Sequence, residues 1–237
     1  MKRTIFFAMT VLLMGMNTMA QDANEEVIVL EDIAVNDILQ QYIDAIGGSD
    51  KLNSVTTYSL SAEAEMQGMK LDLEMKKTSK NQFMQDVKVM GNSMSKQVLD
   101  GDSGYIEMQG QRQDLAAEDI QKIQEESATF PELNYLKAEG ITLEGIETID
   151  GKKTYKLKIS DEKSSFYDME TGLKIQDALM VEAQGQQLST TFTYSDYKEV
   201  DGIKFPFLLT QAMGPQSFDF IVKEIKVNEG VSDADFE

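Results

Sequence analysis

Apolar and polar residues alternate along most of the chain with the two-residue period of a β-strand. In residues 55–66 the even-numbered positions are apolar from Tyr58 onwards, and the odd-numbered positions are serines and glutamates. Residues 69–76 repeat the alternation after a Gln67-Gly68 turn. Two alternating segments joined by a short turn form an antiparallel hairpin with one dry face and one solvated face. The pattern therefore predicts antiparallel β-structure as the main component of the fold.

The same alternation continues to the end of the chain. Asp150-Gly151 and Asp201-Gly202 separate alternating segments and are typical of two-residue hairpin turns. Because most connections are too short for parallel crossovers, we expect a meander of about ten antiparallel strands. After the first hairpin, strands are predicted near residues 82–90, 93–99, 105–108, 141–149, 154–160, 164–169, 173–183, 187–197, 203–211 and 218–227.

Two segments have helical spacing instead. Residues 37–46 carry an apolar stripe, with Asn36 as the predicted N-cap. Residues 115–136 predict a second helical segment that Pro131 divides into two pieces. A sheet of this size curls, and its apolar face has to be covered. The predicted fold class is therefore α+β, mainly antiparallel β: a curved, open half-barrel of about ten strands with helices covering the concave face.

The N-terminus has the pattern of a secretory signal peptide. Lys2 and Arg3 precede an apolar run, and small residues lead up to Ala20. We predict a signal peptide at residues 1–20 cleaved near Ala20, a mobile acidic lead-in at 21–35 and a single β domain at 36–237. The alternative is an N-terminal membrane anchor, but the apolar run is short for a membrane span.

The composition narrows the possible chemistry. The chain has 237 residues, no His, no Cys and a formal charge of −19. Without His or Cys there is no Ser-His or Cys-His nucleophile pair and no ordinary zinc site. The negative charge disfavours nucleic acid and anionic lipid headgroups as partners and favours a monomer. We therefore expect no metal, no cofactor and no catalytic residue.

Methionines gather in the first part of the predicted sheet. Seven lie between residues 66 and 108. Met suits surfaces that re-pack around varied apolar ligands, but it also fills gaps in ordinary cores, and both interpretations stay open. The predicted lining residues of a cavity are Leu60, Met66, Leu71, Leu73, Met75, Met84, Met90, Met108, Phe192, Phe218 and Phe220. The predicted lid residues are Ile120, Ile123, Leu133 and Leu136.

Three segments of the chain resemble a known family. They are YIDAIGGSDKLNSV at 42–55, GIETIDGKKTYKL at 145–157 and DYKEVDGIKFPFLL at 196–209. Segments like these occur in the same order in exported Bacteroidetes proteins whose fold resembles that of LolA and LolB, the lipoprotein carrier and receptor of Gram-negative envelopes. The resemblance covers nearly all of residues 36–237. It implies an open β-barrel covered by helices, with a hydrophobic cavity for acyl chains.

Three further features have a plain explanation beside the chemical one. Residues 100–104 resemble part of a calcium loop but lack its closing Glu, and a tight turn explains them. Glu63 and Glu65 form a carboxylate pair of the kind used by glycosidases, but alternation places both on the solvated face. Arg112 either holds a lid to the barrel or is an exposed charge.

These observations lead to three hypotheses. The first is a soluble periplasmic carrier or sensor that binds the acyl chains of lipids or lipoproteins. The second is a non-catalytic interaction module that partners an envelope peptidase or transporter. Similar segments also accompany insulinase-type zinc peptidases, and this chain has no peptidase metal motif of its own. The third hypothesis is a carboxylate-based hydrolase.

Overall fold

The computed structural model describes residues 33–66, 68–183, 186–214 and 216–237. The predicted signal peptide at 1–20 and residues 21–32 of the predicted lead-in lie outside these ranges. The end of that lead-in is described, and Val35 already belongs to a helix. The described residues form one compact unit, Ile33–Glu237.

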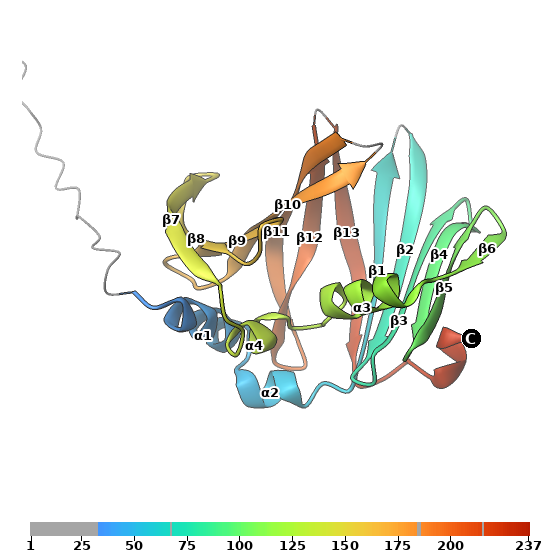
Figure 1. Cartoon of the computed structure of the whole chain (residues 1–237), viewed down its shortest axis with the longest axis horizontal. Coiled ribbons are helices and arrows are strands. Elements are labelled where there is room, and N and C mark those ends of the chain that lie inside the picture. Colours follow the sequence, from blue (N-terminus) through green and yellow to red (C-terminus); the bar gives the residue numbers. More distant parts are fainter. Residues whose placement is uncertain (1–32, 67, 184–185, 215) are drawn as a thin grey trace, which may run out of the picture. The chain divides into compact units, whose positions relative to one another are not determined.

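Thirteen antiparallel strands form one sheet in the order β6-β5-β4-β3-β2-β1-β13-β12-β11-β10-β9-β8-β7 (Figure 1). Across the described residues β6 and β7 each have a single neighbour, so the sheet is open. The strands are β1 Thr57–Met66, β2 Met69–Thr78, β3 Gln82–Val89, β4 Asn92–Asp100, β5 Ser103–Met108, β6 Gln111–Asp114, β7 Thr142–Ile149, β8 Lys152–Lys158, β9 Lys163–Asp168, β10 Lys174–Ala183, β11 Gln186–Val200, β12 Ile203–Met213 and β13 Gln216–Val227.

The strand order consists of two meanders joined in the middle of the sheet. The first runs from β1 outwards to β6, and the second runs from β7 back to β13. Strand β13 then pairs with β1, for example through Leu60 and Ile225. The chain between β6 and β7 therefore connects opposite edges of the sheet. We call this connection, residues 115–141, the strap.

Among the described residues, four α-helices accompany the sheet: α1 Val35–Ile46, α2 Ser49–Asn53, α3 Ala117–Glu126 and α4 Glu132–Tyr135. Helices α3 and α4 belong to the strap (Figure 1). A 3-10 turn at Asp233–Phe236 closes the described chain. Within the described residues, no helix has the length and apolar character needed to cross a bilayer.

One face of the sheet meets the helices, and we call it the inner face. The register places Leu60 opposite Met75 and Ala62 opposite Leu73 on this face. The buried residues of α1 pack against Leu60 and its neighbours in the largest hydrophobic cluster. The α3 residue Ile120 belongs to a separate cluster that Met75 also contacts. Both helical covers therefore lie on the same face, as the predicted fold class requires, and that class is confirmed.

Local expectations differ from the structure in a few places. The apolar stripe predicted for residues 37–46 is buried in α1, but the N-cap of the helix is Ala34 rather than Asn36. Helix α1 starts early because Ile33 and Val35 pack against the main cluster. The sheet has thirteen strands rather than about ten, partly because β6 is short and wholly exposed and so carries no alternation of burial. Helix α2 was not predicted.

Helix α1 ends against the β11–β12 hairpin. The turn residues Asp201 and Gly202 both have positive φ, as the Asp-Gly pattern predicted. Gly47 follows α1 with φ +143°, and a Cβ there would stand 2.8 Å from the carbonyl oxygen of Gly202. The close approach of these two backbones requires glycine at position 47.

The substitution Gly47→Ala is expected to lower the free energy of unfolding by about 3 kcal/mol, because it adds a steric clash to backbone strain. Gly151→Ala is the matched control, since Gly151 also has positive φ but open space at its Cβ position. Strain alone should cost the control about 1 kcal/mol. Urea unfolding measures both variants, and equal losses would contradict the close approach.

Candidate functional site

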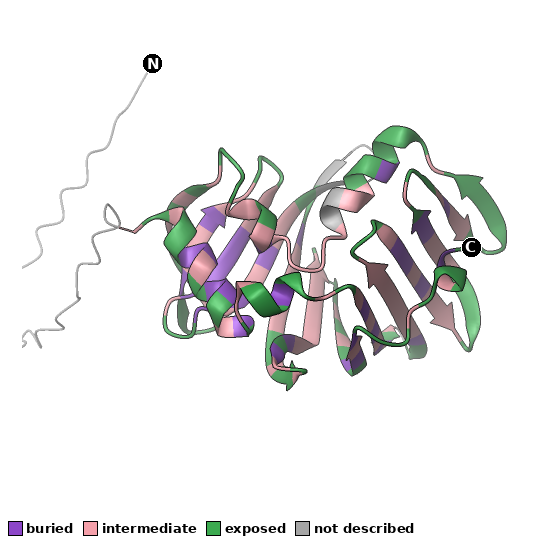
Figure 2. Ribbon diagram, turned by 90° about the horizontal axis from the view of Figure 1, so that it is seen from below, coloured by how far each residue is buried: buried purple, intermediate pink, exposed green. Residues whose placement is uncertain are grey.

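The middle of the inner face is apolar and only half-buried. Strands β2 and β12 have intermediate burial over most of their length, and Figure 2 shows pink, half-buried strands between more deeply buried regions. Large apolar side chains that are normally sequestered therefore remain partly accessible on this face. The half-buried apolar residues of this surface include Leu73, Met75, Val87, Val89, Phe192, Phe207, Leu209, Phe218 and Phe220.

Helix α3 covers the first meander lightly. Its buried residue Ile120 packs with Phe83 of β3 and Leu99 of β4. Ile123 and Leu115 pack around the same cluster. Most other described side chains of α3 are exposed. A contact surface this small makes α3 the weakly held part of the strap.

Helix α4 and its flanks are held more firmly. Phe130, Leu133 and Leu136 pack against the main cluster under α1. The ring of Phe130 lies 6.0 Å from that of Phe205, and Phe205 lies 5.5 Å from Tyr58. Helix α4 also contacts α1 directly. The strap is thus fixed near α4 by packing against both a helix and the sheet.

A buried ion pair anchors α4 to the sheet. Glu132 of α4 is 1% exposed, and its Oε1 lies 2.8 Å from Nζ of Lys174 on β10. The hydroxyl of Tyr167 donates a second hydrogen bond to the same oxygen, at 3.2 Å. Lys174 also lies 3.5 Å from Asp177. Because an unpaired charge is costly in such surroundings, this pair favours one docked position of α4.

Asp177 completes this polar network. Ser165 and Tyr194 donate hydrogen bonds to its two carboxylate oxygens, at 2.6 and 2.9 Å. Burial would raise the pKa of Asp177, but Lys174 and Lys163 together with these hydrogen bonds lower it overall. The carboxylate therefore stays ionised at neutral pH. Its contribution to stability is present above the ordinary Asp pKa and is lost as the pH falls through the lowered value.

Lys77 is the unusual residue of the inner face. It lies opposite Tyr58 on β1 and Phe83 on β3, and its Nζ is 6.0 and 5.9 Å from the two ring centres. Among the described residues, no carboxylate forms an ion pair with it. Burial lowers the pKa of Lys77 to about 8. Burial also raises the pKa of Tyr58, so the phenol stays neutral and provides no counter-ion.

The predicted lining residues are only partly brought together. Those in register with the inner face are Leu60, Met66, Leu71, Leu73, Met75, Met108, Phe192, Phe218 and Phe220. The register of β5 places Met108 on the inner face, but its side chain is 58% exposed near the β6 edge of the sheet.

Two predicted lining residues, Met84 and Met90, are misplaced. Met84 lies on the opposite face, where it packs with Val98, Tyr105 and Phe236. Met90 is 87% exposed in the turn after β3. Met84 and Met90 occupy even-numbered positions, like Asp86 and Lys88, whereas the inner-face residue Val87 has an odd number. The alternation of apolar and polar residues in this segment therefore already indicates that neither Met lies on the inner face.

The predicted lid residues divide between two clusters. Ile120 and Ile123 belong to the α3 cluster, whereas Leu133 and Leu136 belong to the main cluster with α4. Arg112 does not hold the strap. Its side chain is 56% exposed, and its guanidinium lies 3.6 Å from the ring centre of Tyr105. The residues that anchor the strap, Glu132 and Lys174, were missed because they lie 42 positions apart.

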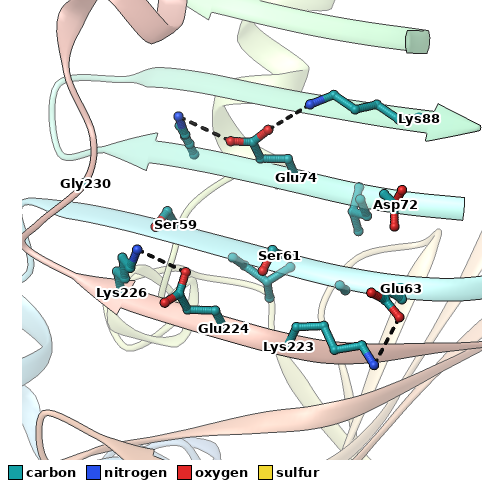
Figure 3. Close-up of a pocket in the computed structure, with 14 residues that line it drawn as sticks. Ser59, Ser61, Glu63, Asp72, Glu74, Lys88, Lys223, Glu224, Lys226 and Gly230 are labelled. Atoms are coloured by element: carbon teal, nitrogen blue, oxygen red, sulfur yellow. Dashed lines mark hydrogen bonds and ion pairs between the residues drawn. The ribbon is translucent and has the colours of Figure 1, made fainter. Parts of the chain in front are cut away.

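The opposite face carries a polar hollow of about 410 Å³ (Figure 3). Its lysines already have carboxylate partners: Lys223 lies 3.1 Å from Glu63, and Lys88 lies 3.1 Å from Glu74. Hydrogen bonds from Lys70 and Lys223 lower the pKa of Glu63. A carboxyl group that acts as a general acid needs a raised pKa, so Glu63 gives no support to the hydrolase hypothesis. The Asp100–Ser103 segment is a tight turn between β4 and β5.

We expect Glu132→Ala to lower the free energy of unfolding by about 3 kcal/mol, because it leaves Lys174 buried without its closest partner. Glu139→Ala changes an exposed carboxylate on the same strap and should have little effect. Urea denaturation distinguishes the two variants. An equally small effect for both would show that the buried pair does not hold α4.

Lys77→Met is expected to stabilise the protein at pH 7. The cost of burying the charge is fully present below the lowered pKa of about 8 and disappears as the pH rises above the ordinary Lys value. With allowance for partial exposure the gain is about 2 kcal/mol at pH 7, and it is smaller at pH 10.

The exposed Lys204 supplies the control for this experiment. Lys204→Met should leave the free energy of unfolding nearly unchanged at both pH values. Urea unfolding at pH 7 and pH 10 makes the comparison. A Lys77→Met variant no more stable than the wild type at pH 7 would contradict the burial of this charge.

Comparison with known proteins agrees with the architecture. No family model and no curated protein matches the chain. Among solved structures, a LolA superfamily protein from Nitrosomonas europaea is 12% identical, with a TM-score of 0.55 over 86% of this chain and 98% of that one. A DUF1329 family protein from Desulfovibrio piger is 13% identical, with a TM-score of 0.53 over 86% and 97%.

A third structure is a Vibrio parahaemolyticus domain named for outer-membrane lipoprotein sorting. It is 11% identical, with a TM-score of 0.51 over 85% of this chain and 95% of that one. At these identities the likeness concerns the fold alone. The open antiparallel sheet with helices on its inner face therefore resembles the fold of the LolA superfamily protein from Nitrosomonas europaea.

Proposed function

We propose that this protein is a non-enzymatic carrier or sensor that binds the acyl chains of lipids or lipoproteins on its inner face. The observation that carries the proposal is the half-buried apolar surface between the two helical covers. The fold likeness to a LolA superfamily protein and to a domain named for lipoprotein sorting supports the same ligand class.

The strap supplies a mechanism for admitting such a ligand. Helix α4 stays docked because Glu132 is paired with Lys174 in a buried site. Helix α3 is held mainly by Ile120 and its neighbours, so it separates from the sheet at lower cost. An acyl chain then replaces the contacts of α3 with Phe83 and Met75. The residues between α3 and α4 act as the hinge.

The hydrophobic effect provides enough binding energy for this exchange. Each buried CH2 group contributes about 0.8 kcal/mol, so a chain of about ten buried carbons offsets the loss of the α3 contacts and the entropy of association. The predicted signal peptide at 1–20 places this activity in the periplasm. In that compartment, acyl chains that have left a membrane need a protein surface to cover them.

The interaction-module hypothesis is favoured by one separate observation. Pairing between β1 and β13 stops at Glu63 and Ile221, and a hollow of about 590 Å³ lies beyond that point. Ile221, which lines this hollow, is 51% exposed. A protein partner would contact the surface around this hollow and Ile221, whereas an acyl chain would contact the inner face.

Adjacent residues of β13 separate the two hypotheses. Phe220→Ala removes apolar area from the inner face and should weaken binding of dodecanol by about tenfold. Ile221→Ala removes a side chain of the outer face and should leave this affinity unchanged. Displacement of the neutral fluorophore N-phenyl-1-naphthylamine measures both variants. Equal losses, or no dodecanol binding by the wild type, would contradict the proposal.

A further inference from the structure

Among the described residues, three lysines of the inner face are buried or half-buried, and two of them have fixed partners. Lys174 is paired with Glu132 and Asp177, and Lys163 lies 3.6 Å from Asp177. Lys77 is the third, and its neighbours across the strands are the rings of Tyr58 and Phe83. An ammonium group half-buried among apolar side chains is unfavourable unless it gains a partner. The partner that this position lacks in the protein is an anion.

The position of Lys77 matches the expected path of a ligand. Phe83 belongs to the cluster under α3, and Tyr58 belongs to the cluster under α1 and α4. Lys77 therefore lies at the seam between the two helical covers. Met75, two residues earlier on the same face of β2, contacts both clusters. A chain lying along Leu73 and Met75 would bring a polar end group to Lys77.

The geometry points to a long-chain fatty acid as the ligand of this site, with its carboxylate paired to Lys77 and its chain on the apolar residues beside it. This inference rests on the proposed function and names the ligand class. A single ammonium group matches a single negative charge. The lysine is flanked by two aromatic rings, of which Tyr58 alone carries a further donor, so a small headgroup fits its surroundings better than a large polar one.

The overall charge of −19 disfavours anionic headgroups as partners. That expectation concerns charges on the exposed surface, whose effect salt screens within about 10 Å. Lys77 acts over a few ångströms in a medium of lower dielectric constant, where one direct ion pair outweighs distant screened charges. Removal of the charge from water lowers the pKa of Lys77. An ion pair with a carboxylate would offset the same desolvation cost.

The test compares dodecanoate with dodecanol, which have the same chain and differ in the charged end. Affinities are measured by displacement of N-phenyl-1-naphthylamine at pH 7. The wild type should bind dodecanoate about tenfold more tightly than dodecanol, because a charge-assisted hydrogen bond forms in a partly desolvated site. Lys77→Met should abolish this preference, because it removes the only charge that distinguishes the two end groups at this position. Lys77→Arg should retain the preference, and Lys204→Met should behave as the wild type.

The outcomes separate this inference from the proposed function. If Lys77→Met binds dodecanoate as tightly as the wild type does, recognition of the carboxylate by Lys77 is overturned, while binding of acyl chains stands. A wild type that binds both ligands equally also overturns it. If neither ligand binds, the proposed function itself fails, and the inference fails with it. The unfolding measurements on Lys77→Met show independently whether that variant is folded.

Discussion

The position of the strap is the constraint on which the rest of the structure depends. Strands β6 and β7 lie at opposite edges of the sheet, yet they are consecutive in sequence. The strap therefore has to run from one edge of the sheet to the other. It crosses a face of the sheet, and the two short helices it carries are too small to cover that face completely.

The two ends of the strap are held by different kinds of interaction. At α4 the ion pair of Glu132 and Lys174 adds direction to the hydrophobic contacts, because a buried charge tolerates few positions of its partner. At α3 the contacts are few and mostly apolar, with one hydrogen bond that Gln124 donates to the carbonyl oxygen of Gly101. An apolar ligand competes directly with the apolar contacts of α3 and hardly at all with the ion pair that holds α4. This asymmetry explains how a ligand could displace one helix without unfolding the strap.

Much of the fold was accessible from the sequence because it follows from local patterns. Alternation predicted the strands, and Asp201-Gly202 predicted a turn that the structure contains. The same alternation places Lys77 in line with Met75 on the dry face. The pairing of β1 with β13 and that of Glu132 with Lys174 join distant segments. No local pattern encodes such contacts, because they depend on how the whole sheet assembles.

The most direct test of this account is to locate the acyl chain by NMR. Intermolecular nuclear Overhauser effects from 13C-labelled dodecanoate should reach Leu73, Met75 and Phe220, which line the inner face. Ile221, which is exposed on the opposite face of β13, should show none. Contacts confined to Ile221, or a saturating ligand without contacts to the inner face, would contradict the claim that the gap left by the strap is a binding site.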